Sequence, residues 1–186
     1  MTDAFGAGDA VIFMKIGTHA NEDLGDIIER KKREIREAGY SMWGYGGNTC
    51  HPTSIVQPFA RNHAASNHPI RLCMHPMESR HFAVPVRAEQ YSVDGVEWES
   101  IPSSINVLGS RYALCITGLR EADAQLQLIN TRVAIGNSTG RIGADYVRGH
   151  VDKACLEVVS PGDASEGIQI GFVADVVEPY AVFLRN

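Results

Sequence analysis

The chain contains no apolar run of the roughly eighteen residues that a transmembrane helix needs, and we therefore expect no contact with a membrane. Its first ten residues, MTDAFGAGDA, include acidic but no basic side chains, unlike the start of a secretory signal peptide. Both absences lead us to expect a cytoplasmic protein.

An excess of positive charge is also lacking. The 186 residues include 17 Lys and Arg against 22 Asp and Glu, which gives a formal net charge of -5 at pH 7. Proteins that bind duplex nucleic acid through its phosphates need a basic surface. The overall charge therefore argues against strong duplex binding, but it allows a local basic pocket and a ligand of the size of one nucleotide.

The four cysteines form no CxxC pair. In a cytoplasmic chain we expect such cysteines to be reduced. Cys115 and Cys155 lie in apolar stretches, where a thiol usually packs as a small hydrophobic side chain. Cys50 and Cys73 differ, because a histidine follows each of them within two residues.

The length suits one domain that buries a sizeable core, and residues 1–186 show no linker and no internal repeat. Residues 10–17 predict a buried strand. Apolar side chains at helical spacing then predict a long amphipathic helix, capped by Asn21 and ended by Gly39. Its charged face carries Lys and Arg interleaved with Glu, and we expect that face to be solvated.

The second half of the chain is dominated by strand patterns. Asp94-Gly95, between alternating residues, predicts a two-residue hairpin turn, and a short helix is expected near 140–148. The predicted strands cover residues 70–74, 81–91, 111–119, 126–135, 154–159, 168–176 and 180–184. We therefore predict an α+β fold whose mostly antiparallel sheet could close into a barrel.

Regular patterning stops between about residues 40 and 69, where Gly, His and small polar residues dominate. Loops of this length in a compact domain are usually functional or disordered. The segment opens with MWGYGGNTCHP, in which Trp43 or Tyr45 could stack on a ring and Asn48 could bind a polar edge. The same stretch could also be no more than a bend between two core elements.

Five of the seven histidines fall between residues 51 and 81. Three of them precede proline, which restricts the backbone of the preceding residue. Because imidazole titrates near neutral pH, His51, His75 and His81 are our candidates for a general base. Cys50, directly before His51, is the candidate nucleophile. Packing or surface roles are the alternative for each.

Zinc is another use for these side chains, since Cys50-His51 and Cys73-x-His75 together could offer four ligands. Adjacent Cys and His, however, do not readily aim at one tetrahedral ion. We therefore predict no metal site, and the sequence indicates no particular cofactor.

A second polar segment, GNSTGR at residues 136–141, follows a predicted strand and precedes the predicted short helix. Ser138 and Thr139 could help to bind an anion there, and Arg141 or Arg148 could meet a phosphate. The segment lacks both the GK[ST] ending of a P-loop and the GxGxxG of dinucleotide-binding folds. A capped polar turn is the alternative.

His19 ends the first predicted strand, and segments after strand ends often carry function. An isolated histidine at such a place is more often structural.

Met14-Lys15 on a strand, the glycine-bounded helix, Trp43-Gly44 and Asn48 together resemble the opening of EVE and YTH domains of the PUA-like group. The resemblance covers about the first fifty residues. It implies a small barrel with an aromatic pocket for a modified base, and hence a non-enzymatic reader of such a base or of single-stranded nucleic acid.

Three functional hypotheses follow. The leading one is a pocket that binds, and could hydrolyse or transfer, an anionic or nucleotide-like small molecule. The others are the PUA-like reader and a protein-interaction module. The leading hypothesis predicts that Trp43, Asn48 and His51 share one cavity with the region of Arg141.

Overall fold

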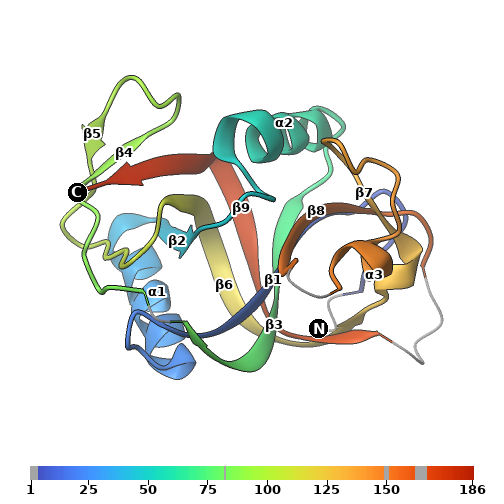
Figure 1. Cartoon of the computed structure of the whole chain (residues 1–186), viewed down its shortest axis with the longest axis horizontal. Helices are drawn as coiled ribbons and strands as arrows, with labels where there is room; N and C mark the ends of the chain where they lie inside the picture. The colour runs from blue at the N-terminus through green and yellow to red at the C-terminus, as the bar shows by residue number, and fades with distance from the viewer. Residues whose placement is uncertain (1–3, 82, 149–150, 162–166) are drawn as a thin grey trace.

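The computed structural model (Figure 1) describes residues 4–81, 83–148, 151–161 and 167–186, with the backbone alone for residues 79–81. Its strands are β1 (Ala10–His19), β2 (Ser41–Tyr45), β3 (Ile70–His81), β4 (Gln90–Ser92), β5 (Glu99–Ser100), β6 (Tyr112–Leu126), β7 (Thr131–Val133), β8 (Lys153–Val158) and β9 (Ile168–Arg185). Its helices are α1 (Leu24–Ala38), α2 (Gln57–Ala65) and α3 (Gly143–Tyr146), with a π-helical turn η1 (Pro52–Val56) and a 3-10 turn η2 (Leu128–Asn130).

All nine strands belong to one sheet, in the order β2-β6-β9-β3-β1-β8-β7, and the β4–β5 hairpin joins it through β9. Of the described strand pairs, β1 with β3 is parallel and the others are antiparallel. The predicted α+β class with a mostly antiparallel sheet is therefore confirmed. The sheet does not close into a barrel, because its two ends, β2 and β7, are not paired with each other.

Strand β1 lies inside the sheet and is covered on both faces, which explains why its residues are almost all apolar. Ile12 and Met14 point into the core beneath α1 and α2, whereas Val11 and Phe13 point into a second core that includes Val147. In Figure 1 the long strands β6 and β9 accordingly run between α1 on the left and α3 on the right.

Helix α1 confirms the predicted helix and its end. Gly39 follows it with φ 85°, a left-handed conformation that glycine adopts without strain, and its N–H binds the carbonyl of Ile35. The cap is Asp23 instead of Asn21. The charged face is not fully solvated: Lys31 and Glu34 are only 2% and 1% exposed, because β2 and the segment around Asn106 cover them.

The prediction of an irregular segment at 40–69 is largely wrong, because β2, η1 and α2 all lie within it. Phe59 and Ala60 are buried, so the polar residues of this segment cover the outside of a short packed helix. His51 caps the start of η1, and its Nδ1 accepts a hydrogen bond from the N–H of Ser54 at 3.4 Å. Irregular chain remains mainly between β2 and η1.

Other local predictions need correction. Residues 83–89 form no strand apart from an isolated bridge at Arg87, although 81–91 was predicted to be one. A hairpin at Asp94-Gly95 is present, but its connection between β4 and β5 spans residues 93–98 instead of two residues. Within this connection the side chain of Asp94 accepts hydrogen bonds from two backbone N–H groups. Helix α3 is shorter than predicted and is capped by Ile142, so neither Ser138 nor Thr139 caps it.

None of the helices in the described part of the chain is both long enough and apolar enough to cross a membrane.

Candidate functional site

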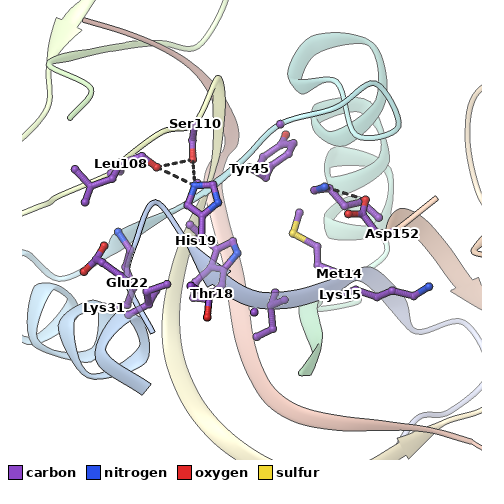
Figure 2. A pocket seen from close by; sticks show the side chains of 18 of the residues that line it. Met14, Lys15, Thr18, His19, Glu22, Lys31, Tyr45, Leu108, Ser110 and Asp152 are labelled. Carbon is purple, nitrogen blue, oxygen red and sulfur yellow. Dashed lines mark hydrogen bonds and ion pairs between the residues drawn. The ribbon is translucent and has the colours of Figure 1, made fainter. Parts of the chain in front are cut away.

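A cavity of about 340 Å³ opens between the second half of β1, helix α1, strand β2 and the segment 107–110 (Figure 2). Its volume lies in the range of small-molecule sites, about 300–1,000 Å³. Two glycines and a mixed set of charged, polar and apolar side chains line the cavity. They include Met14, Lys15, His19, Glu22, Arg30, Lys31, Trp43, Gly44, Tyr45, Gly46, Ser110, Asp152 and Lys153.

The turn between β1 and α1 places His19 and Glu22 at the cavity. The backbones of these two residues exchange hydrogen bonds of 3.1 and 2.9 Å. Ala20 and Asn21 between them adopt positive φ angles of 49° and 64°, a conformation that is uncommon for residues other than glycine. The tight turn brings the end of the strand directly beside the start of the helix.

Strand β2 approaches the segment 107–110 closely because residue 44 is glycine. A Cβ at Gly44 would lie 2.3 Å from Oγ of Ser110 and 2.8 Å from a methyl group of Val107. The absence of a side chain therefore lets Ser110 reach the cavity beside β2.

His19 and Ser110 meet at the carbonyl of Leu108, as the dashed lines in Figure 2 show. Nε2 of His19 lies 3.0 Å from this carbonyl, which can only accept, so Nε2 carries the proton. The hydroxyl of Ser110 donates to the same carbonyl at 3.1 Å. In this arrangement His19 does not act as a base toward Ser110, although the two side chains are 3.4 Å apart.

A buried ion network forms the α1 side of the cavity. Lys31 donates to Oε2 of Glu34 at 3.1 Å and to the carbonyl of Asn106 at 2.8 Å. Glu34 also accepts from the hydroxyl of Ser41 and from the N–H of Asn106, and Nε of Arg30 lies 3.3 Å from its Oε1. Burial lowers the pKa of Lys31 to about 8, although the charge of Glu34 opposes this shift.

The opposite end of the cavity carries Lys15 and Asp152, which lie well apart from Glu22 and Lys31 in Figure 2, and Lys153 also lines the cavity. Lys153 pairs with Asp152 at 2.9 Å, whereas Lys15 donates to the carbonyl of Val147 at 3.2 Å. The whole lining holds four Lys or Arg side chains against two acidic ones, Glu22 and Asp152.

An apolar wall separates the two charged ends. Trp43 and Tyr45 project from β2, and Met14 projects from β1. The hydroxyl of Tyr45 donates to the carbonyl of Cys50 at 2.6 Å, and burial raises its pKa. Tyr45 is therefore a neutral, fixed side chain at the wall of the cavity.

The structure separates the predicted site residues. Trp43 and Tyr45 line the cavity, but Asn48 is exposed and outside it. His51 packs against the rings of Tyr112 and Phe183, with centroid distances of 5.7 and 5.4 Å, and does not line the cavity.

The remaining candidate bases also lie elsewhere. Nδ1 of His75 lies 2.6 Å from the carbonyl of Gln169 and donates to it. The side chain of His81 lies outside the described residues, although its backbone pairs with His19.

Cys50 is 1% exposed, and its Sγ lies 4.0 Å from that of Cys155. All four cysteines are buried thiols. The described part of the chain brings together no group of three His, Cys, Asp or Glu side chains that could hold a metal ion.

The GNSTGR segment forms a turn on another part of the surface. The hydroxyl of Thr139 donates to the carbonyl of Gly136 at 2.5 Å, and Ser138 is only partly buried. Arg141 lies 5.9 Å from the ring centre of Tyr146, and Arg148 pairs with Asp145 at 3.6 Å. None of the four predicted anion-binding residues lines the cavity.

The sequence predictions missed Arg30, Lys31 and Ser110. A signal for Lys31 was present, because it lies three and four residues after Ile28 and Ile27 and so shares their buried face. The surrounding run of charged residues obscured it.

No protein-family model, curated protein or solved structure matches this chain. The interpretation of the cavity therefore depends on its own geometry.

Proposed function

We propose that the protein binds a small molecule that combines an apolar ring with an anionic group in the cavity between β1, α1, β2 and residues 107–110. The observation that supports this most directly is the composition of the lining, which joins the rings of Trp43 and Tyr45 to four Lys and Arg side chains. A nucleotide-like molecule belongs to this class of ligand, and we propose that the protein meets it in the cytoplasm.

The charge pairing favours one orientation. Arg30 and Lys31 already face carboxylates, Glu22 and Glu34. Lys15 donates to a neutral carbonyl and pairs with no carboxylate among the described residues. An anionic group placed at Lys15 gains an ion pair without breaking an existing one, and the ring then lies against Trp43 and Tyr45.

The proposal concerns binding. A hydrolytic or transfer reaction would need an activated nucleophile in the cavity, and the hydroxyl of Ser110 donates to a carbonyl instead of to a base.

Calorimetric titration with AMP, adenosine and inorganic phosphate tests the proposal. AMP combines both groups, so we expect it to bind more tightly than either part alone. Lys15→Ala should weaken AMP binding about tenfold and leave adenosine binding unchanged, since only the anionic group contacts Lys15. Equal affinity of Lys15→Ala and the unchanged protein for AMP would contradict the orientation.

A glycine pair tests the location. A Cβ at Gly46, which lines the cavity, or at Gly25, which lies on the exposed start of α1, would meet no atom within 4 Å. Gly46→Leu should therefore fill the cavity and abolish binding, while Gly25→Leu serves as the matched control. If none of the three compounds binds, or if Gly46→Leu binds normally, the proposal is wrong.

The second candidate is a reader of a modified base, and the pair Trp43 and Tyr45 favours it because a flipped base needs such rings. Binding to single-stranded oligonucleotides with a steep decrease in added salt would support it. Tight binding of AMP without oligonucleotide binding would support the small-molecule pocket instead.

A further inference from the structure

Strand β2 lies at one end of the sheet and has a neighbouring strand on one side only. It pairs with β6 along its whole length, and none of the other described strands pairs with it. An edge strand leaves a row of main-chain N–H and C=O groups without partners in the sheet. Gly44, and Gly46 directly after the strand, line the cavity, so this edge belongs to the binding site described above.

One hydrogen bond fixes the direction of the main-chain groups at this end of β2. The carbonyl of Tyr45 accepts from the N–H of Arg111, which directly precedes β6, at 3.2 Å. In a trans peptide unit the N–H points opposite to the C=O, so the N–H of Gly46 points away from β6. Because successive residues of a strand direct their main-chain groups to opposite sides, the carbonyl of Gly44 points away from β6 as well.

These two groups are available to a ligand. Outside the pairing of β2 with β6, neither Gly44 nor Gly46 forms a hydrogen bond with another described residue. Both glycines are only partly buried, and neither has a side chain that could screen its main chain from the cavity. Since main-chain groups inside proteins are nearly always paired, an unpaired acceptor and donor beside a cavity indicate a place for a polar ligand.

Strand β1 shows the same pattern where it lines the cavity. β8 pairs with it only at Ala10–Met14, and the N–H of Lys15 donates to the carbonyl of Asp152 at 2.9 Å. Beyond Lys15, none of the described strands continues β8 along β1. The cavity therefore lies between two strand ends that each lack a neighbour on one side.

We infer that the ring of the bound ligand is a heterocycle whose edge carries a hydrogen-bond donor beside an acceptor, an inference that rests on the proposed binding function of the same cavity. The carbonyl of Gly44 accepts from the donor, and the N–H of Gly46 donates to the acceptor. Adenine has such an edge, where its amino group lies next to a ring nitrogen. The placement agrees with the orientation proposed above, because it keeps the ring at β2 and the anionic group at Lys15.

An extended peptide is the other kind of molecule that pairs with a strand edge. The cavity, at about 340 Å³, lies near the lower limit of the volumes of small-molecule sites. The edge that borders it is also short, since β2 ends at Tyr45. Both features favour a single ring.

A matched pair of ligands and a matched pair of variants test the inference by calorimetric titration. Benzimidazole riboside 5′-monophosphate keeps the fused rings, ribose and phosphate of AMP but lacks the amino group and the ring nitrogen beside it. Gly46→Pro removes the N–H of residue 46, and Gly46→Ala keeps it. A Cβ at Gly46 meets no atom within 4 Å, so both substitutions have space.

We expect the unchanged protein to bind AMP about tenfold more tightly than the benzimidazole nucleotide, since only AMP forms both hydrogen bonds. Gly46→Ala should keep this ratio. Gly46→Pro should reduce it to about threefold, because the hydrogen bond to the carbonyl of Gly44 remains and the other is lost.

Amide hydrogen exchange, followed by NMR, is a second measurement that needs no variant. Binding of AMP should slow the exchange of the Gly46 N–H at least about tenfold, because the ligand becomes its partner. The benzimidazole nucleotide should leave this rate unchanged. The N–H of Trp43, which faces β6, is the internal reference and should respond equally to both ligands.

The negative results have different meanings. If both nucleotides bind with equal affinity and AMP does not protect the N–H of Gly46, the inference is wrong and the binding function stands. A preference for AMP that Gly46→Pro leaves at its full size also overturns the inference. If neither nucleotide binds, the binding proposal fails and this inference fails with it.

Discussion

The pKa of Lys31 predicts a specific dependence of stability on pH. Its value in the folded chain, about 8, lies below the ordinary 10.5, so between these values the unfolded chain holds more protons than the folded one. The contribution of Lys31 to the free energy of unfolding should therefore rise with pH over this window, by up to about 3 kcal/mol. Urea unfolding of the unchanged protein and of Lys31→Met at pH 7.5 and pH 10 measures it.

The comparison uses the difference between the two proteins, because other groups titrate in the same window. The free energy of unfolding of the unchanged protein should increase relative to that of Lys31→Met as the pH rises. A difference that stays constant would mean that the pKa of Lys31 is the same in the folded and the unfolded chain.

The thiol of Cys50 gives a second prediction for a single residue. Cys50 and Cys155 are 1% and 3% exposed, and the hydrogen bond between the two thiols, together with burial, raises the pKa of Cys155. Because it is the thiolate that attacks thiol reagents, the buried thiols of the native protein should react at least about 100-fold more slowly than those of the protein unfolded in guanidinium. Labelling with Ellman's reagent, followed by peptide mapping, measures both rates. Fast, selective labelling of native Cys50 would instead support the nucleophile hypothesis.

The candidate site could be predicted only in part. Trp43 and Tyr45 were singled out because aromatic residues among glycines are conspicuous, whereas His19, at the end of a strand, was expected to be structural. Lys31 and Ser110 line the cavity because segments far apart in the chain pack together. The residue pattern within one segment does not reveal such packing. His51 looked catalytic for its chemistry, but its ring packs against Tyr112 and Phe183.

At the scale of the elements, two glycines of α1 and its C-terminal cap should respond in opposite ways to substitution by alanine. Gly25 lies in the exposed first turn, where a Cβ meets no atom within 4 Å, whereas Gly39 adopts φ 85°. Gly25→Ala should stabilise the protein by about 0.5–1 kcal/mol through the unfolded state. Gly39→Ala should destabilise it by about 1 kcal/mol, because a left-handed conformation strains alanine. Denaturant unfolding of both variants checks the signs, and a loss of stability in Gly25→Ala would contradict the first.

Secondary structure could be predicted where apolar residues recur at helical spacing over many residues, as in α1. It could not be predicted where contacts with distant segments determine the structure. Helix α2 is short and polar in composition, and the burial of its residues Phe59 and Ala60 becomes visible only in the folded chain. The buried Lys31–Glu34 pair likewise depends on β2 and the segment around Asn106, which lie far from α1 in sequence.

At the scale of the whole molecule, the sequence indicated the α+β class but not the strand order. The sequence of β1 predicts a buried strand because apolar residues occupy both of its faces. Its parallel partner β3 and its antiparallel partner β8 lie about sixty and about one hundred and forty residues away, beyond the reach of local patterns. That pairing brings Lys153 beside the cavity lined by Lys15, so that residues from distant parts of the chain share one site.

The whole molecule should lose stability in alkali because it buries several neutral acids. Burial raises the pKa of Cys115 to about 12 from 9.0 and also raises the pKa of Tyr45, and the hydrogen bond with Cys50 together with burial raises the pKa of Cys155. These groups keep their protons in the folded chain while the unfolded chain releases them, so their contribution is complete below pH 9 and decreases as the pH rises. Cys115 alone should account for about 2 kcal/mol between pH 9 and 10.5. Urea unfolding across this range should show a steeper loss for the unchanged protein than for Cys115→Ala, and equal slopes would show that Cys115 is not the group responsible.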